Sequence, residues 1–274
     1  MKKTLLLSTL SAIAFMITIT TLFADDLEGD IDPAHAAYIA QGLAQWKEIT
    51  QKALTDDEAL KTFIRGCFDL EFYTGSDLPS IYDCAKSLSQ SEIARERLIG
   101  MLETMIREAL IAFEKSDKSY PTAGHDVLNF LSTLENFSDY DALPLVKECL
   151  RSKSEIVRGY GAKTYAVIKG AKAFPFLHEA IEKGDLPEES RATLYWYLGH
   201  DFIVRLKREK RTDVANQFCA FLKEMAQTEQ SVNNARGLDL ILYANAENYK
   251  DSSQRTNILN RIKQMEQQAE QPVE

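Results

Sequence analysis

The sequence is poor in the residues on which most metal and catalytic sites depend. Its 274 residues include only four histidines and four cysteines, and they contain no Gly-rich phosphate loop, Ser nucleophile motif or Cys-x-x-Cys pair. Basic residues are also few, 32 against 41 acidic ones, which gives a net charge of −9. Because nucleic acid is bound through clustered Lys and Arg, we expect no nucleic-acid ligand. We also expect no metal and no cofactor.

Long apolar runs are missing from the chain, except at its start. Lys2 and Lys3 precede a segment without charge, residues 4–23, and acidic residues begin at Asp25. This layout is typical of a secretory signal peptide and predicts cleavage after Ala24. About 20 apolar residues can also span a bilayer, so an uncleaved anchor is the alternative, and only then do we expect contact with a membrane. The prediction is a periplasmic or secreted protein.

Strand-like alternation is absent as well, and nearly every segment has helical periodicity. Apolar residues recur at spacings of three and four from Leu98 to Phe113, which predicts a long amphipathic helix. Ser89 and Glu92 have the spacing of a capping box before it. Asp32-Pro33 predicts an earlier helix through Trp46 to about Leu54. Further helices are expected near 56–75, 122–135, 140–151, 154–169, 171–183, 188–205, 212–226, 230–246 and 252–267. The fold class is therefore all-α.

Two segments of the chain are similar to each other. ALPLVKECLRSKSEIVRGYGAKTYAVIKG starts at Ala142, and AFPFLHEAIEKGDLPEESRATLYWYLG starts at Ala173. In this alignment Pro144 matches Pro175, and Arg158 matches Arg191. The two segments resemble HEAT-like repeats, in which Pro comes early in a first helix and Val-Arg opens a second. The clear resemblance covers residues 142–199.

The resemblance implies a fold and an organisation. In this family, helix pairs stack into a right-handed α-α superhelix, or solenoid, because no pair can bury its apolar face alone. Gly161 and Ala162 are expected to let neighbouring helices approach closely. The acidic residue that often pairs with the family's Arg is missing from the turn of the first unit, so we expect irregular stacking. The expected regions are a signal peptide (1–24), an N-terminal helical region (25–138), a repeat region (139–268) and a flexible tail (269–274).

The cysteines leave one pairing open. Cys67 and Cys84 lie on either side of a predicted helix turn, and export makes a disulfide possible between them if the turn brings two helices together. Cys149 and Cys219 are too far apart in a repeat array to meet. For these two we predict buried thiols.

A protein or peptide is the expected partner, since stacked helix pairs of this family offer a long concave surface. Tyr195, Trp196 and Tyr197 are consecutive on a second helix, so at least one of them is expected to reach solvent. Trp and Tyr are favoured at contact hot spots. We therefore predict a binding neighbourhood of these three residues with Arg158 and Arg191, although both arginines can serve stacking alone.

Two other functions stay open at this stage. Gly-His-Asp occurs twice, and His125, Asp126, His200 and Asp201 are the ligands of a hypothetical metal-dependent hydrolase. This version requires the four side chains to converge. The other alternative is a structural component of an envelope assembly. A basic cluster at residues 205–211 is explained by the negative end of a helix dipole, with docking of an acidic partner as the alternative.

Overall fold

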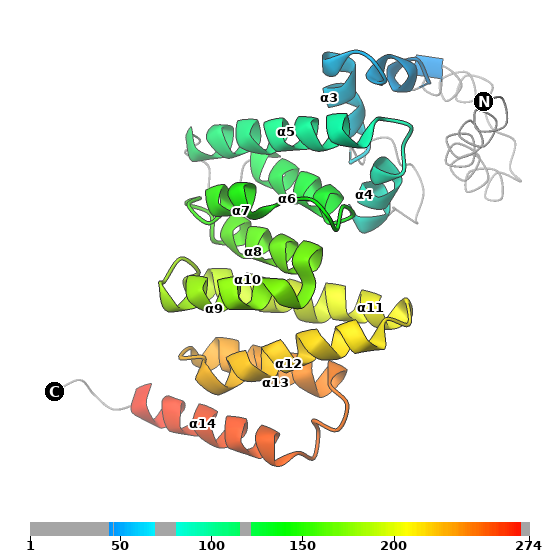
Figure 1. The fold of residues 1–274 in the computed structure, drawn as a ribbon. Coiled ribbons are helices and arrows are strands. Elements are labelled where there is room, and N and C mark those ends of the chain that lie inside the picture. The colour runs from blue at the N-terminus through cyan, green and yellow to red at the C-terminus, as the bar shows by residue number, and fades with distance from the viewer. Residues whose placement is uncertain (1–43, 46, 69–80, 116–121, 270–274) are drawn as a thin grey trace, which may run out of the picture. The chain divides into compact units, whose positions relative to one another are not determined.

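A computed structural model of the chain describes residues 44–45, 47–68, 81–115 and 122–269. Every regular element in these ranges is a helix (Figure 1), which confirms the all-α class. The internal contacts divide the chain into two compact units, Met1–Phe137 (unit 1) and Ser138–Glu274 (unit 2). None of the helices in the described ranges has both the length and the hydropathy that crossing a bilayer requires.

Unit 1 is built around one long helix. Its elements are α3 (Asp57–Gly66), α4 (Ile81–Ser89), α5 (Arg95–Lys115) and α6 (Thr122–Leu134). The stripe predicted from Leu98 to Phe113 is the buried face of α5, and α6 packs against both α5 and α4. The side chain of Asp56 caps α3 by accepting a hydrogen bond from the Ala59 backbone N–H at 2.7 Å. This bond satisfies one of the free amides at the helix start.

One local prediction in unit 1 is wrong. Ser89 and Glu92 do not form a capping box, because α4 continues to Ser89 and α5 begins only at Arg95. The Ser89 hydroxyl instead donates to the Lys86 carbonyl at 2.7 Å, within the last turn of α4. The helix predicted from Asp32 is described only at residues 44–45 and 47–53, which are helical, and Trp46 lies outside the described residues.

Unit 2 contains helices where the sequence predicts them. They are α7 (Leu143–Cys149), α8 (Glu155–Lys169), η2 (Gly170–Ala173), α9 (Phe174–Glu182), α10 (Glu188–Trp196), η3 (Tyr197–Ile203), α11 (Val204–Arg208), α12 (Thr212–Thr228), α13 (Val232–Asn245) and α14 (Ser253–Ala269). The helix expected over 188–205 is not uniform, because its middle, η3, is a π-helix. Helices α12 and α13 pack against each other.

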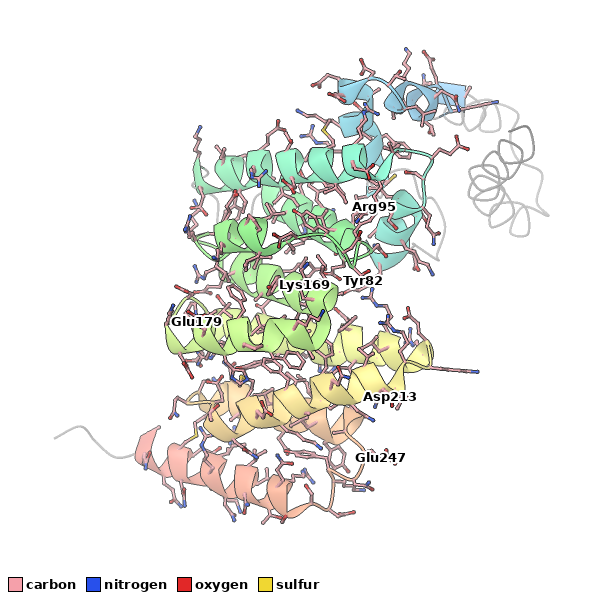
Figure 2. The ribbon with its side chains drawn as sticks, viewed as in Figure 1. Tyr82, Arg95, Lys169, Glu179, Asp213 and Glu247 are labelled. Atoms are coloured by element: carbon pink, nitrogen blue, oxygen red, sulfur yellow. The ribbon has the colours of Figure 1, made fainter. Side chains whose placement is uncertain are left out.

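The helices of unit 2 follow one another as neighbours, with side chains between them (Figure 2). α7 contacts α8, α8 contacts α10, α10 contacts α13, and α13 contacts both α12 and α14. In Figure 1, α10 lies behind α9 and α13 lies behind α12. Between α9 and α12, the ring of Phe174 stacks on Phe221, with centroids 4.6 Å apart, and meets Phe218 edge-on at 5.2 Å. These contacts join one helix pair to the next.

Small residues allow α7 and α8 to approach closely, as predicted. A Cβ atom added to Gly161 would lie 2.7 Å from the Cβ of Cys149, and Ala162 beside it is fully buried. The hydroxyl of Ser154 caps α8 by accepting from the Val157 N–H at 3.3 Å. The start of α8 is therefore fixed by a cap and its middle by a contact that only a small residue permits.

Candidate functional site

Arg191 forms a buried ion pair in unit 2. Its Nε donates to Oε2 of Glu229 at 2.8 Å and its Nη2 to Oε1 at 2.6 Å, while Nη1 donates to the Leu186 carbonyl at 3.1 Å. The Glu229 side chain is only 1% exposed. It also accepts from the Tyr195 hydroxyl at 3.1 Å and from the Ser231 N–H at 3.0 Å. This network links α10 to the turn before α13.

The network sets the charge state of its members. Burial acts to raise the pKa of Glu229, but hydrogen bonds from Arg191, the Ser231 N–H and Tyr195 outweigh it and hold the pKa below the ordinary value. Burial, reinforced by the charge of Glu229, raises the pKa of the Tyr195 hydroxyl. The carboxylate is thus ionised and the phenol is neutral at pH 7, which is the pairing that the hydrogen bonds require.

Arg158, which matches Arg191 in the alignment of the two similar segments, lies on α8. Its Nε donates to the hydroxyl of the buried Ser190 at 3.1 Å, and its Nη1 donates to the Ser152 carbonyl at 2.5 Å. The Nε of Arg158 thus donates to a serine, whereas the Nε of Arg191 donates to a glutamate. Both arginines of the predicted binding set are held by hydrogen bonds inside the fold, between successive helix pairs.

The aromatic triplet divides between core and solvent, as predicted. Tyr195 is 3% exposed and Trp196 is 57% exposed. Tyr197 is partly buried and meets the ring of Tyr160 edge-on, with centroids 4.7 Å apart. The Trp196 indole lies against the exposed imidazole of His200, with centroids 3.9 Å apart. Trp196 is therefore the member of the set that is available to a partner.

Helix α13 runs beside α10 in the same direction. The Nδ2 of Asn234 donates to the Glu188 carbonyl at 2.9 Å near the start of both helices. Further along, Nδ2 of Asn245 donates to the Gly199 carbonyl at 3.4 Å. Since two bonds with the same spacing in sequence tie the helices at both ends, the exposed sides of α10, η3 and α13 form one surface.

Apolar side chains are concentrated on this surface. Leu240 is 65% exposed and Tyr243 is 42% exposed on α13. With Trp196 they are three of the five large apolar side chains that are exposed among the described residues. Trp196 and Leu240 both come nine positions after the N-caps of their helices, Pro187 and Ser231. We call the surface of Trp196, His200, Leu240 and Tyr243 the α10–α13 face.

Cations border one end of the α10–α13 face. The guanidinium of Arg255 lies 4.5 Å from the centre of the Tyr243 ring, and the Lys250 ammonium lies 5.6 Å from it. Arg255 is anchored from the other side by Asp239, with Nε to Oδ1 at 3.1 Å. This arrangement holds the tyrosine ring in place while one side of it stays open to solvent.

Sequence reasoning missed Leu240 and Tyr243. Helix α13 lies outside residues 142–199, to which the clear repeat resemblance is limited, and an apolar residue in a helix is assigned to the core by default. Leu240 comes as many positions after its N-cap as Trp196 does after its own, and this match is the feature that points to Leu240 as an exposed residue. This match can be recognised only when the N-caps of both helices are known.

The residues of the hydrolase alternative are divided between the two units. His125 and Asp126 lie on α6 of unit 1, and His200 and Asp201 lie on η3 of unit 2. Burial raises the pKa of the half-buried Asp126. In the part of the chain that the structure describes, no three His, Cys, Asp or Glu side chains are grouped so that they could hold a metal ion.

The four cysteines are buried, as predicted for Cys149 and Cys219, and all are free thiols in the structure. Burial raises the pKa of the Cys67 thiol, and the neighbouring Cys84 raises it further. The two are thus close enough to interact, and their pairing in an oxidising compartment stays a prediction.

Comparison with known proteins found no matching family model, no matching curated sequence and no matching solved structure. The function is therefore argued from the α10–α13 face.

Proposed function

We propose that this protein is an exported scaffold that binds a protein or peptide on the α10–α13 face. We also propose that the helix pairs of unit 2 are HEAT-like repeats stacked as a right-handed solenoid. The matching hydrogen bonds of Arg158 and Arg191 at successive pairs support the repeat. The layout of residues 1–24 supports export.

The observation that carries the binding proposal is the exposure of Trp196 and Leu240 on two helices that pack against each other. Water contact with large apolar groups is unfavourable, at about 25 cal/mol per Å² of apolar surface. Single exposed apolar residues are ordinary, but a cluster on one surface is typical of an interaction site. Trp and Tyr are also the residue types that most often dominate binding energy. The face therefore suits an apolar side chain or helix face of a partner.

A comparative capture experiment tests the proposal. The mature chain is immobilised and incubated with the envelope fraction of its native host, and the bound proteins are quantified by mass spectrometry. Trp196→Ala and Leu240→Ser are compared with the wild type. Ile111→Ser is the matched control, because Ile111 is 55% exposed near the C-terminal end of α5, outside the face. Circular dichroism verifies that each variant is folded.

We expect a partner that the wild type and Ile111→Ser retain and that the two face variants lose. The loss of a hot-spot residue weakens binding by about 2 kcal/mol or more, roughly 30-fold, which a direct titration of the identified partner would measure. Equal recovery of every bound protein by all four chains would refute binding at this face.

A further inference from the structure

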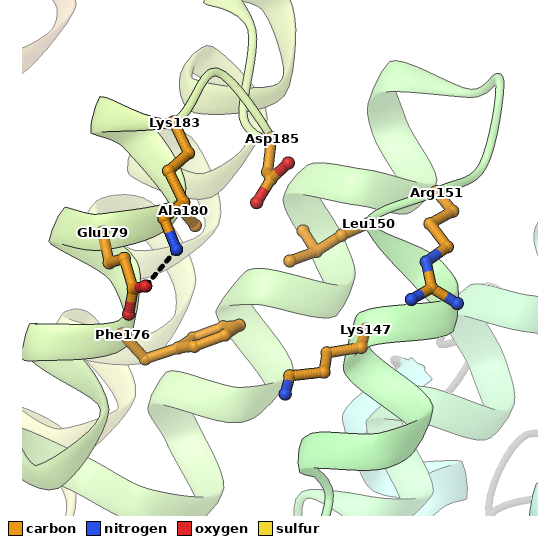
Figure 3. A pocket seen from close by; sticks show the side chains of 8 residues that line it. All are labelled: Lys147, Leu150, Arg151, Phe176, Glu179, Ala180, Lys183 and Asp185. Carbon is orange, nitrogen blue, oxygen red and sulfur yellow. Dashed lines mark hydrogen bonds and ion pairs between the residues drawn. The ribbon is translucent and has the colours of Figure 1, made fainter.

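Unit 2 also has a hollow, which lies between α7 and α9. It is an open groove of about 360 Å³ (Figure 3). Lys147, Leu150 and Arg151 line it from α7 and the residues after it, and Phe176 and Ala180 line it from α9. None of these residues belongs to the α10–α13 face. The groove is therefore a separate candidate site.

The floor of the groove is apolar and fixed in place. The ring of Phe176 meets Tyr165 of α8 edge-on, with centroids 5.0 Å apart. Ala180 is 2% exposed, and Leu150 is partly buried against the core. Phe176 is also only partly covered, so the floor offers apolar surface to a ligand without rearrangement of the fold.

The rim of the groove carries more positive than negative charge. Lys147 and Arg151 are exposed and lie one helical turn apart, and within the described residues neither is hydrogen-bonded or ion-paired through its side chain. The third cation, Lys183, is paired with Glu179, as the dashed line in Figure 3 shows. This hydrogen bond lowers the pKa of Glu179, and the more distant charge of Lys147 adds to the effect. With Asp185, the rim has three cations and two carboxylates.

We propose that this groove binds an acidic peptide segment that carries apolar side chains. The carboxylates of such a segment pair with Lys147 and Arg151, and its apolar side chains lie on Phe176 and Leu150. The charge of the groove supports this choice, because the rim is locally positive on a chain whose net charge is −9. A basic segment would meet Lys147 and Arg151 with like charge, and a purely polar one would leave the floor in water.

Fluorescence anisotropy of a labelled synthetic peptide tests the proposal. The probe is a short peptide of alternating glutamate and leucine, titrated with the full chain at low salt. We expect the double charge reversal Lys147→Glu/Arg151→Glu to weaken binding on the order of tenfold, since each rim ion pair is worth up to about 1 kcal/mol. Added salt should weaken binding to the wild type and affect the reversed variant less.

A matched control separates the groove from net charge. Lys172→Glu/Arg208→Glu makes the same change in net charge at two exposed residues that do not line the groove. This control and Trp196→Ala, which alters only the α10–α13 face, should both bind the probe as the wild type does. Equal weakening by the two double variants would mean that the peptide senses only overall charge, and it would overturn the site.

Two further peptides test the chemistry of the ligand. A glutamate–serine peptide should bind clearly less well than the probe, because it cannot cover the apolar floor, and a lysine–leucine peptide should not bind. The proposal fails if either one binds as well as the probe, or if the probe does not bind. It also fails if sedimentation shows a dimer that only Lys147→Glu/Arg151→Glu disrupts, since the groove would then hold a second copy of the chain.

Discussion

At the residue scale, the two arginines of the predicted binding set form hydrogen bonds inside the fold. Sequence reasoning did not predict the partner of Arg191. Arg158 and Arg191 are recognisable because both follow the start of a predicted second helix. The carboxylate that binds Arg191 comes from Glu229, in the turn between α12 and α13. A single sequence contains 41 acidic residues, and spacing alone does not indicate which of them is near.

Replacement of Glu229 tests the strength of this pair. Glu229→Gln removes the charge but keeps the size of the side chain, and it leaves the guanidinium of Arg191, 16% exposed, without its counter-ion. We expect the free energy of unfolding at pH 7 to fall by about 2–3 kcal/mol. Urea titration of the wild type and the variant measures this difference.

The effect of Glu229→Gln should depend on pH. The folded pKa of Glu229 lies below the ordinary value of 4.5. The carboxylate therefore stabilises the fold fully above pH 4.5, and its contribution is lost as the pH falls through the lowered folded value. The gap in stability between wild type and variant should narrow in that acid range. A gap that stays constant from pH 7 to pH 3 would show that the ion pair does not stabilise the fold.

At the element scale, the sequence predicts where helices lie but not how their turns are wound. Residues 188–205 have one continuous helical pattern, yet Tyr197–Ile203 form a π-helix. The wider turn contains Gly199, whose carbonyl accepts from Asn245 of α13. This bond joins η3 to another helix, and periodicity along one segment carries no record of such contacts.

Gly199 allows η3 to lie against α13. A Cβ atom added there would be 2.3 Å from Cγ2 of Ile241. This methyl carbon is bonded to the Cβ of a β-branched side chain, so it has little freedom to move. We expect Gly199→Ala to lower the free energy of unfolding by about 1–3 kcal/mol, the usual cost of overpacking a core. In Gly100→Ala, the control, the added Cβ meets no atom within 4 Å. That variant should gain up to about 1 kcal/mol from helix propensity.

A double-mutant cycle identifies the cause of the Gly199 effect. Ile241→Ala removes the three Ile241 atoms that lie nearest to the new Cβ. Gly199→Ala should therefore cost much less in the Ile241→Ala background than in the wild type, although Ile241→Ala is itself destabilising. If the two substitutions add without interaction, the close approach of η3 and α13 is not what requires glycine.

At the scale of the whole molecule, sequence periodicity was sufficient for the class and for most helices of unit 2. The reason is that each helix there has its own buried stripe, which a single sequence records directly. Ser89 shows the limit, since its hydroxyl suits the end of one helix as well as the start of the next. Leu240 shows a second limit of prediction from sequence. It is exposed on a surface that two helices form together, and the pattern of one helix does not reveal that surface.

The core of unit 2 predicts that this unit folds alone. A single cluster of buried side chains extends from Ala162 to Ile262, and every member of it belongs to unit 2. We therefore expect a fragment of residues 138–274 to be helical and to unfold in urea in one cooperative transition. Trp196 is the only tryptophan in this fragment. Its fluorescence reports on its own surroundings, while circular dichroism reports on all the helices. If the fragment unfolds in two states, both probes give the same urea midpoint.

A core substitution makes this test decisive. Leu198 is fully buried beside Trp196 in sequence, and Leu198→Ala in the fragment should cost about 2–5 kcal/mol through the cavity it leaves. Because most of the buried side chains of unit 2 belong to this one cluster, both probes should move together to lower urea. Separate midpoints would mean that the helix pairs unfold one after another, as weakly coupled repeats do. A fragment without near-ultraviolet circular dichroism would contradict independent folding, since fixed packing of its aromatic core would then require residues before Ser138.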